Sequence, residues 1–276
     1  MPVLAGHEWS HRDRRQAKEL LFSACVARSV TKAEVRTNTK AVQALLKEWD
    51  KLRAAGTWDE TKVQEWSEVS AAARKGGESV HVGLIFEICV EKGSELDDTD
   101  PARKYKGRVV FMGNEVRDQN FDYAIFDELS SAPASMAAAK AADAYGVCEN
   151  HVIQQADAEQ AYIQSKLGGT PTWVRLPRER WPAAWKGMRD PVCPLVLALY
   201  GHPDSGGYWE KHCNTHLTSV GFVPVPEWRS CFYHPTLGLY LTVYVDDFKM
   251  SGEAKALQKG WALIRKKIKM EDPTPR

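Results

Sequence analysis

Apolar residues recur at helical spacing near the start of the chain, between residues 38 and 56. The positions that share this helical face are Val42, Leu45, Leu46, Trp49 and Leu52. Asn38 or Thr39 is suited to cap the helix, and Gly56 is suited to end it. The pattern therefore predicts one helix here, and a weaker pattern predicts a second helix over residues 59–73.

Two stretches rich in β-branched and aromatic residues follow: "SVHVGLIFEICVEKG" over residues 79–93 and "KYKGRVVFMGN" over residues 104–114. The segment between them, "GSELDDTDPA", is polar and turn-forming. Strand-forming runs that are joined by such a turn predict a long β-hairpin.

Helical and strand patterns alternate through the rest of the chain. In "SSAPASMAAAKAADAYG", Ser131 can act as a cap, Pro133 falls in the first turn, and Gly146 ends a run of helix formers. A strand follows over residues 151–156 and breaks after Asp157. The later elements are a helix over 204–221, strands at 231–235, 236–245 and 248–252, and an amphipathic helix with Leu257, Trp261, Ile264 and Ile268. This order predicts an α+β fold.

Composition and charge narrow the possible functions only slightly. The chain has 276 residues and 43% hydrophobic content, which is typical of a soluble globular protein. Its 37 basic and 36 acidic residues give a formal net charge of +1. The protein as a whole therefore has no strong positive charge that could attract nucleic acid. Any binding to nucleic acid must come from local patches of basic residues.

Residues 1–37 are polar and basic, and we expect them to lead into one domain that spans residues 38–276. The N-terminus has no apolar core of signal-peptide length, and the longest apolar run, "LVLALY", is far shorter than the roughly 20 residues that span a bilayer. The 6 cysteines have no repeated spacing, which indicates reduced thiols. These features favour an intracellular protein without a membrane partner.

The stretch "LTVYVDDFKMSG" places Asp246 and Asp247 between two apolar runs, where a tight turn between strands is expected. Two carboxylates within about 4–6 Å repel each other, and a divalent cation would relieve that repulsion. Asp157 ends another strand, so three carboxylates would converge if the two strands are neighbours. That arrangement suits two-metal phosphoryl transfer. The alternative is an exposed turn like the one that holds Asp97 and Asp98.

Four motifs, in the correct order, resemble the reverse transcriptase domain of Ty1/copia-type retrotransposons. They are "YVDD" at 244–247, "DAEQAYI" at 157–163, the basic hairpin strand "KYKGRVVFMGN", and "LYGHPDSGGYWEKHCNTHLTSVGF" at 199–222. The resemblance covers roughly residues 40–270 and implies a right-hand polymerase with fingers and an antiparallel palm sheet, and with a thumb that is absent or truncated. It also implies a Pol polyprotein of a transposable element, whose products undergo DNA integration.

The resemblance also assigns roles to particular residues. Asp157, Asp246 and Asp247 would be the catalytic, metal-binding carboxylates for two Mg²⁺ ions, or for Mn²⁺. The backbone carbonyl of Ala158 would be a further ligand, and Tyr162 would exclude a 2′-OH from the incoming sugar. Lys106 and Arg108 would contact the triphosphate, with Arg108 the stronger candidate.

The implied activity is RNA-directed DNA polymerisation, in which dNTPs are added to a primer 3′-OH on an RNA or DNA template. The expected location is a cytoplasmic virus-like particle or the nucleus. Asp204 stands where the family has a Gln, and an acidic residue beside a triphosphate is electrostatically unhelpful. No protease, integrase or RNase H sequence is present, so we expect a fragment of a polyprotein or a decayed copy.

Three alternatives remain open from the residues. One is a non-catalytic nucleic-acid-binding remnant of the same element, and another is a metal-dependent nuclease that uses the same carboxylates. The third is a zinc site at His212, Cys213 and His216, against which a buried helical face is the plainer interpretation. The basic "IRKKIKM" near the C-terminus is either a solvated helix face or a contact with template backbone.

Overall fold

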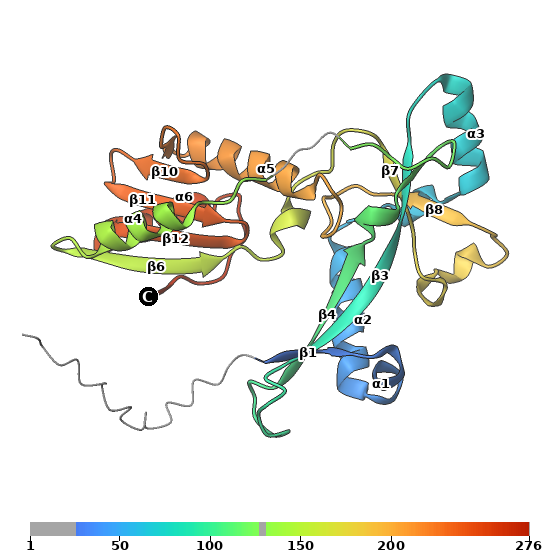
Figure 1. The fold of residues 1–276 in the computed structure, drawn as a ribbon, viewed down its shortest axis with the longest axis horizontal. Coiled ribbons are helices and arrows are strands. Elements are labelled where there is room, and N and C mark those ends of the chain that lie inside the picture. Colours follow the sequence, from blue (N-terminus) through green and yellow to red (C-terminus); the bar gives the residue numbers. More distant parts are fainter. Residues whose placement is uncertain (1–25, 127–130, 276) are drawn as a thin grey trace, which may run out of the picture.

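The computed structural model describes residues 26–126 and 131–275, which form two β-sheets with helices packed on them (Figure 1). The basic cluster from Arg12 to Lys18 and the thiol of Cys25 lie outside the described residues. Six α-helices are described: α1 (Lys32–Thr37), α2 (Thr39–Ala54), α3 (Trp66–Gly76), α4 (Met136–Gly146), α5 (Ser205–Ser219) and α6 (Ala254–Ile264). The mixed α/β prediction is confirmed.

The seven-stranded sheet is built around the long strand β3. Its strands are β1 (Ala27–Val30), β2 (Gln64–Glu65), β3 (His81–Lys92), β4 (Lys104–Phe111), β5 (Arg117–Asp118), β7 (Thr172–Arg175) and β8 (Pro191–Pro194). β3 and β4 pair from Ile85↔Phe111 to Lys92↔Lys104, so the predicted hairpin is confirmed. β1 also pairs with β3, and the last part of the basic lead-in segment therefore belongs to this sheet.

The six-stranded sheet is antiparallel throughout, in the order β13-β6-β12-β11-β10-β9. Its strands are β6 (His151–Asp157), β9 (Val223–Pro224), β10 (Cys231–His234), β11 (Leu239–Tyr244), β12 (Asp247–Glu253) and β13 (Thr274–Pro275). The sequence interpretation required the strand that ends at Asp157 to lie beside the strand that leads into Asp246. The structure instead pairs β6 with β12, the strand that begins at Asp247, and β12 separates β6 from β11. In the described part of the chain, short 3-10 helices join successive elements: η1 (Glu60–Lys62), η2 (Gly113–Glu115), η3 (Ala161–Gln164), η4 (Arg178–Arg180) and η5 (Ala183–Trp185).

Helices cover both faces of the six-stranded sheet because successive side chains of β12 point to opposite faces. On one face, Lys249 donates from Nζ to the carbonyl of Ala139 in α4, 3.0 Å away, and Ser251 donates to the carbonyl of Ala142. On the other face, Phe248 and Met250 are fully buried in a core that α5 and α6 complete. The sheet is thus held between two helical layers (Figure 1).

Two large hydrophobic cores stabilise the molecule, one beside each sheet. The core of the six-stranded sheet includes Trp209, Phe248 and Ala161 of η3. The core of the seven-stranded sheet includes Trp49 and Phe111, and Ile163 of η3 packs against it. The short turn η3 therefore contacts both cores.

Two helices begin later than the sequence predicts. α3 begins at Trp66, well after residue 59, because Gln64 and Glu65 form β2 and pair with β8. α4 begins at Met136, and Ser135 caps it in place of Ser131. The segment around Pro133 is not helical, because the neighbouring Ala134 amide donates to the carbonyl of Val243 in β11.

The first predicted helix is confirmed as α2, with the side chain of Asn38 accepting from the Ala41 amide at 3.1 Å. Leu45, Trp49 and Leu52 are buried, whereas Leu46 is exposed. The last predicted helix is confirmed as α6, but it ends at Ile264, so Ile268, which was expected on the helix, lies beyond it. Among the described residues, no helix has the length and apolar character that crossing a membrane requires.

Helix α2 packs very closely on the hairpin at Gly107. A Cβ atom at this position would lie 2.6 Å from the carbonyl oxygen of Ala44 and 2.8 Å from the Cα atom of Leu45, both of which belong to the α2 backbone. Because neither atom can move as a flexible side chain would, this position requires glycine. The close contact fixes the strand that carries Lys106 and Arg108 against α2.

We expect Gly107→Ala to lower the free energy of unfolding by about 1–3 kcal/mol, because the added methyl group must push α2 away from β4. Denaturant unfolding would measure this loss. Gly76→Ala is the matched control, since a Cβ there meets only the Glu78 side chain at 3.7 Å, an ordinary contact. An equal loss in both variants would contradict close packing at Gly107.

Candidate functional site

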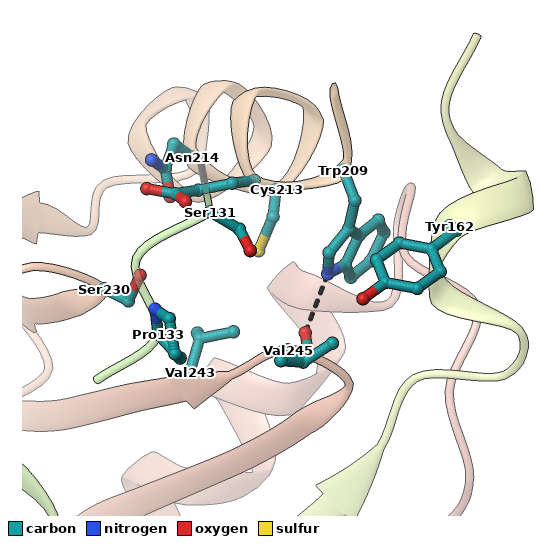
Figure 2. Close-up of a pocket in the computed structure, with 10 residues that line it drawn as sticks. Ser131, Pro133, Tyr162, Trp209, Cys213, Asn214, Ser230, Val243 and Val245 are labelled. Carbon is teal, nitrogen blue, oxygen red and sulfur yellow. Dashed lines mark hydrogen bonds between the residues drawn. The ribbon is translucent and has the colours of Figure 1, made fainter. Parts of the chain in front are cut away.

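The turn between β11 and β12 holds the aspartate pair in a strained backbone. Val245 has a φ of 58°, in the left-handed region that a β-branched residue rarely adopts. Such a conformation costs about 1–3 kcal/mol and persists where surrounding contacts impose it. Two hydrogen bonds of 2.7 Å do so. The Ala158 amide donates to the carbonyl of Asp246. The Trp209 indole donates to the carbonyl of Val245, as Figure 2 shows.

The pairing of β6 with β12 sets Asp157 directly opposite Asp247. Side chains at such positions have Cβ atoms about 4.5–5.5 Å apart, and like charges there destabilise the sheet. Burial, together with Asp157 and then Asp246, raises the pKa of Asp247 from 3.8 to about 6. All three aspartates are exposed, so cations in solution can reach them.

The oxygen donors of Asp157 and Asp247 suit a hard divalent cation such as Mg²⁺, and their mutual repulsion is what a cation would relieve. Within the described part of the chain, however, no three His, Cys, Asp or Glu side chains are grouped so that they could hold a metal ion. The structure therefore brings two carboxylates together, and Asp246 lies next to them in the turn without completing a three-carboxylate group.

Tyr162 lies beside this turn, on η3. Burial, together with the neighbouring Tyr200 and Asp246, raises the pKa of its phenol. The Tyr162 and Tyr200 rings are 5.8 Å apart, centroid to centroid. Tyr162 also lines a small cavity beneath the turn with Trp209 and Val245 (Figure 2).

Lys106 and Arg108 project from the exposed face of β4, opposite the face that Gly107 presses against α2. The Arg108 guanidinium carbon is 5.5 Å from the centre of the Tyr200 ring. Burial, Arg108 and Lys92 lower the pKa of Lys106, whereas Glu48 and Asp246 act in the opposite direction.

Two further contacts between the sheets were not anticipated from the sequence. Gln160 donates to the carboxylate of Glu48 at 3.5 Å, and burial is the main reason that the pKa of Glu48 is raised. Tyr200 links Arg108 to Tyr162 through its ring. In the sequence, the signal for this contact was that Glu48, a charged residue, lies next to the apolar face of α2.

A comparison with protein-family models matches residues 92–275 to the family described as reverse transcriptase (RNA-dependent DNA polymerase). The matched segment covers most of the chain and contains every candidate site residue from Lys106 to Asp247. The chain belongs to this reverse transcriptase family. A search of curated proteins gave no match. A reverse transcriptase domain acts in general on a nucleic-acid template and on dNTPs.

Asp204 has a structural position within the reverse transcriptase domain. It is buried and lies directly before the first turn of α5, as the N-cap residue. Its side chain makes no cap hydrogen bond to the helix. Asp204 therefore has a buried position in the fold at the start of α5.

The cluster of His212, Cys213 and His216 lies within α5 and contributes to packing. Nε2 of His216 donates to the carbonyl oxygen of Ile264, 2.8 Å away near the end of α6. Cys213 is buried in the core, and burial raises the pKa of its thiol to about 12. His216 therefore joins α5 to α6 through its Nε2 atom.

We expect Asp247→Asn to stabilise the metal-free protein at pH 7.5. The folded state binds a proton at Asp247 more tightly than the unfolded chain does, so stability falls as pH rises from about 4 to about 6. The exposed position of the side chain reduces the gain in unfolding free energy to about 1 kcal/mol. Thermal unfolding in EDTA would measure a higher Tm at pH 7.5 and almost no change at pH 4.

Asp98→Asn is the control for this prediction, because Asp98 is 84% exposed and pairs with Arg103 at the surface. A Tm for Asp247→Asn that is unchanged or lower at pH 7.5 would show that the opposing carboxylates do not repel each other in the folded protein.

Proposed function

We propose that the chain is the RNA-directed DNA polymerase of a copia-like retrotransposon, derived from a Pol polyprotein. In this proposal the six-stranded sheet is the palm, and the β3–β4 hairpin with α2 belongs to the fingers. The observation that carries the proposal is the register of β6 and β12, which places Asp157 opposite Asp247 beside a strained turn. The family match supports the same conclusion.

The proposed reaction joins the primer 3′-oxygen to the α-phosphorus of a dNTP and releases pyrophosphate. Asp157 and Asp247, with Asp246 and the carbonyl of Ala158, would hold two Mg²⁺ ions, or Mn²⁺. Bound there, the ions would lower the pKa of the primer hydroxyl and offset the charge on the leaving group. The site residues themselves supply oxygen donors that are open to solvent and fixed by the sheet.

Lys106 and Arg108 are proposed to bind the triphosphate. They are exposed cations on a strand that is held rigidly against α2, and Lys106 senses the charge of Asp246. Fixed positive charges are effective where negative charge develops in the transition state. Arg108 is the stronger candidate, because its guanidinium forms paired hydrogen bonds to phosphate oxygens.

Tyr162 is proposed to select the deoxyribose sugar. Its ring lines the cavity beside the aspartate turn, together with Val245, and lies 5.8 Å from the Tyr200 ring, centroid to centroid. A ring in this place would meet the 2′-OH of a ribonucleotide, whereas a deoxynucleotide would fit.

Template and primer are proposed to bind mainly through their phosphates, so that affinity falls as the salt concentration rises. The non-catalytic remnant remains the competing interpretation. One sequence argument for it was the acidic Asp204, and the buried place of Asp204 at the start of α5 gives that residue a structural explanation. The proposed polymerase would act in a cytoplasmic virus-like particle or in the nucleus.

Primer extension on poly(rA) with oligo(dT), Mg²⁺ and dTTP tests the proposed activity. We expect Asp157→Asn and Asp246→Asn each to reduce extension by at least about 100-fold, as loss of one electrostatic group in an active site commonly does. Asp98→Asn, in the exposed aspartate pair of the hairpin turn, should leave extension unchanged. Full activity of Asp157→Asn or Asp246→Asn would refute the proposal, and template degradation would indicate a nuclease.

Sugar selection is tested by replacing Tyr162. We expect Tyr162→Ala to lower the preference for dTTP over UTP by at least about 10-fold, because the ring that blocks the 2′-OH is removed. Tyr162→Phe keeps the ring and should keep the preference. Single-nucleotide incorporation assays would measure both ratios, and an unchanged ratio in Tyr162→Ala would remove Tyr162 from this role.

A further inference from the structure

We infer that Trp209 is a positioning residue for the aspartate turn: its indole N–H fixes the carbonyl of Val245 and so sets the placement of Asp246 and Asp247. The inference rests on the proposed polymerase function and adds a residue outside the carboxylates, the hairpin cations and Tyr162. Trp209 does not touch the reacting atoms in this proposal. It acts through the backbone of the turn.

Trp209 is itself held firmly. It is 2% exposed, and its ring belongs to the core of the six-stranded sheet. The ring stacks on His212 of the same helix, with centroids 6.0 Å apart and planes inclined by 26°. One turn further along α5, His216 attaches the helix to the carbonyls at the end of α6. The donor that meets Val245 therefore comes from a rigid helix.

The turn needs such a partner because its backbone is strained. Val245 adopts a φ of 58°, and a β-branched residue leaves that region unless other contacts hold it there. Figure 2 shows the indole nitrogen of Trp209 directed at the Val245 carbonyl. The indole nitrogen and the carbonyl oxygen are 2.7 Å apart. Rotation of this peptide group would move the next two residues, which are the aspartates.

Of the contacts described at this turn, the one from Trp209 is made by a side chain. The described hydrogen bonds to the other backbone groups of the turn come from the backbone: Tyr244 pairs with Asp247 at the ends of β11 and β12, and the Ala158 amide donates to Asp246. A substitution at Trp209 therefore removes one restraint on the turn and leaves the sheet register in place. The structure thus offers a way to loosen the turn alone.

Trp209→Phe keeps an aromatic ring and removes the N–H donor. We expect kcat for primer extension to fall about 30-fold, which corresponds to about 2 kcal/mol, with the KM for primer-template unchanged. The matched control is Trp261→Phe: Trp261 is 3% exposed in the same core and donates to the side chain of Gln154 at 2.8 Å, away from the turn. Both variants lose one buried indole hydrogen bond, so equal losses of kcat would overturn the inference.

A second substitution separates positioning from general packing. Glycine adopts positive φ without steric cost, so Val245→Gly removes the strain that the Trp209 bond opposes. The double variant Trp209→Phe/Val245→Gly should therefore recover at least about 3-fold of the kcat that Trp209→Phe loses. A purely structural role for Trp209 predicts additive losses and no recovery, and that result would also overturn the inference.

Hydrogen exchange distinguishes failure of this inference from failure of the proposed function. Amide exchange in a peptide that spans residues 239–250 should be faster in Trp209→Phe than in the parent chain or in Trp261→Phe. If the parent chain extends no primer but this exchange pattern is found, the polymerase proposal fails and the hold of Trp209 on the turn stands. Equal exchange rates in this peptide for all three proteins would refute that hold directly.

Discussion

The pairing of β6 with β12 is the constraint on which the candidate site depends. Its register joins two segments far apart in the sequence and sets Asp157 opposite Asp247. Side chains alternate between the faces of a strand, so a shift by one residue would exchange the buried and exposed positions of β12. Phe248 and Met250 belong to one core, and Lys249 and Ser251 bond to α4 on the other face. Both faces therefore hold the register that aligns the carboxylates.

The same register creates an electrostatic cost at the end of the sheet. The carboxylates of Asp157 and Asp247 face each other across the strands. Val245, which precedes the Asp246–Asp247 pair, has a strained backbone conformation. Neither feature favours the folded state. Helix α4 packs on one face of the sheet, and α5 and α6 pack on the other. Their buried apolar side chains and hydrogen bonds to the sheet stabilise the fold and so compensate for the strain and the charge repulsion. Local strain and like charges that the rest of a fold supports are typical of functional sites.

Much of this arrangement could be predicted from the sequence, because it follows from local patterns. The hairpin, α2 with its Asn38 cap and the strand after the aspartates were predicted from periodicity and turn residues. The start of α4 was wrong, since Ser131 and Ser135 are equally good caps and a tertiary contact of Ala134 decides between them. The Trp209 bond and the Glu48–Gln160 contact depend on how distant elements meet, and no spacing along the chain encodes that.

The turn η3 connects the two halves of the molecule in a way that bears on motion. Ala161 is anchored in one core and Ile163 packs against the other, while Tyr162 between them faces the aspartate turn. Because η3 contacts both cores, a rotation of one core relative to the other would act on its backbone dihedral angles. Tyr162 would swing with that rotation. Opening and closing of the two halves would thus be mechanically coupled to the width of the space beside Asp246.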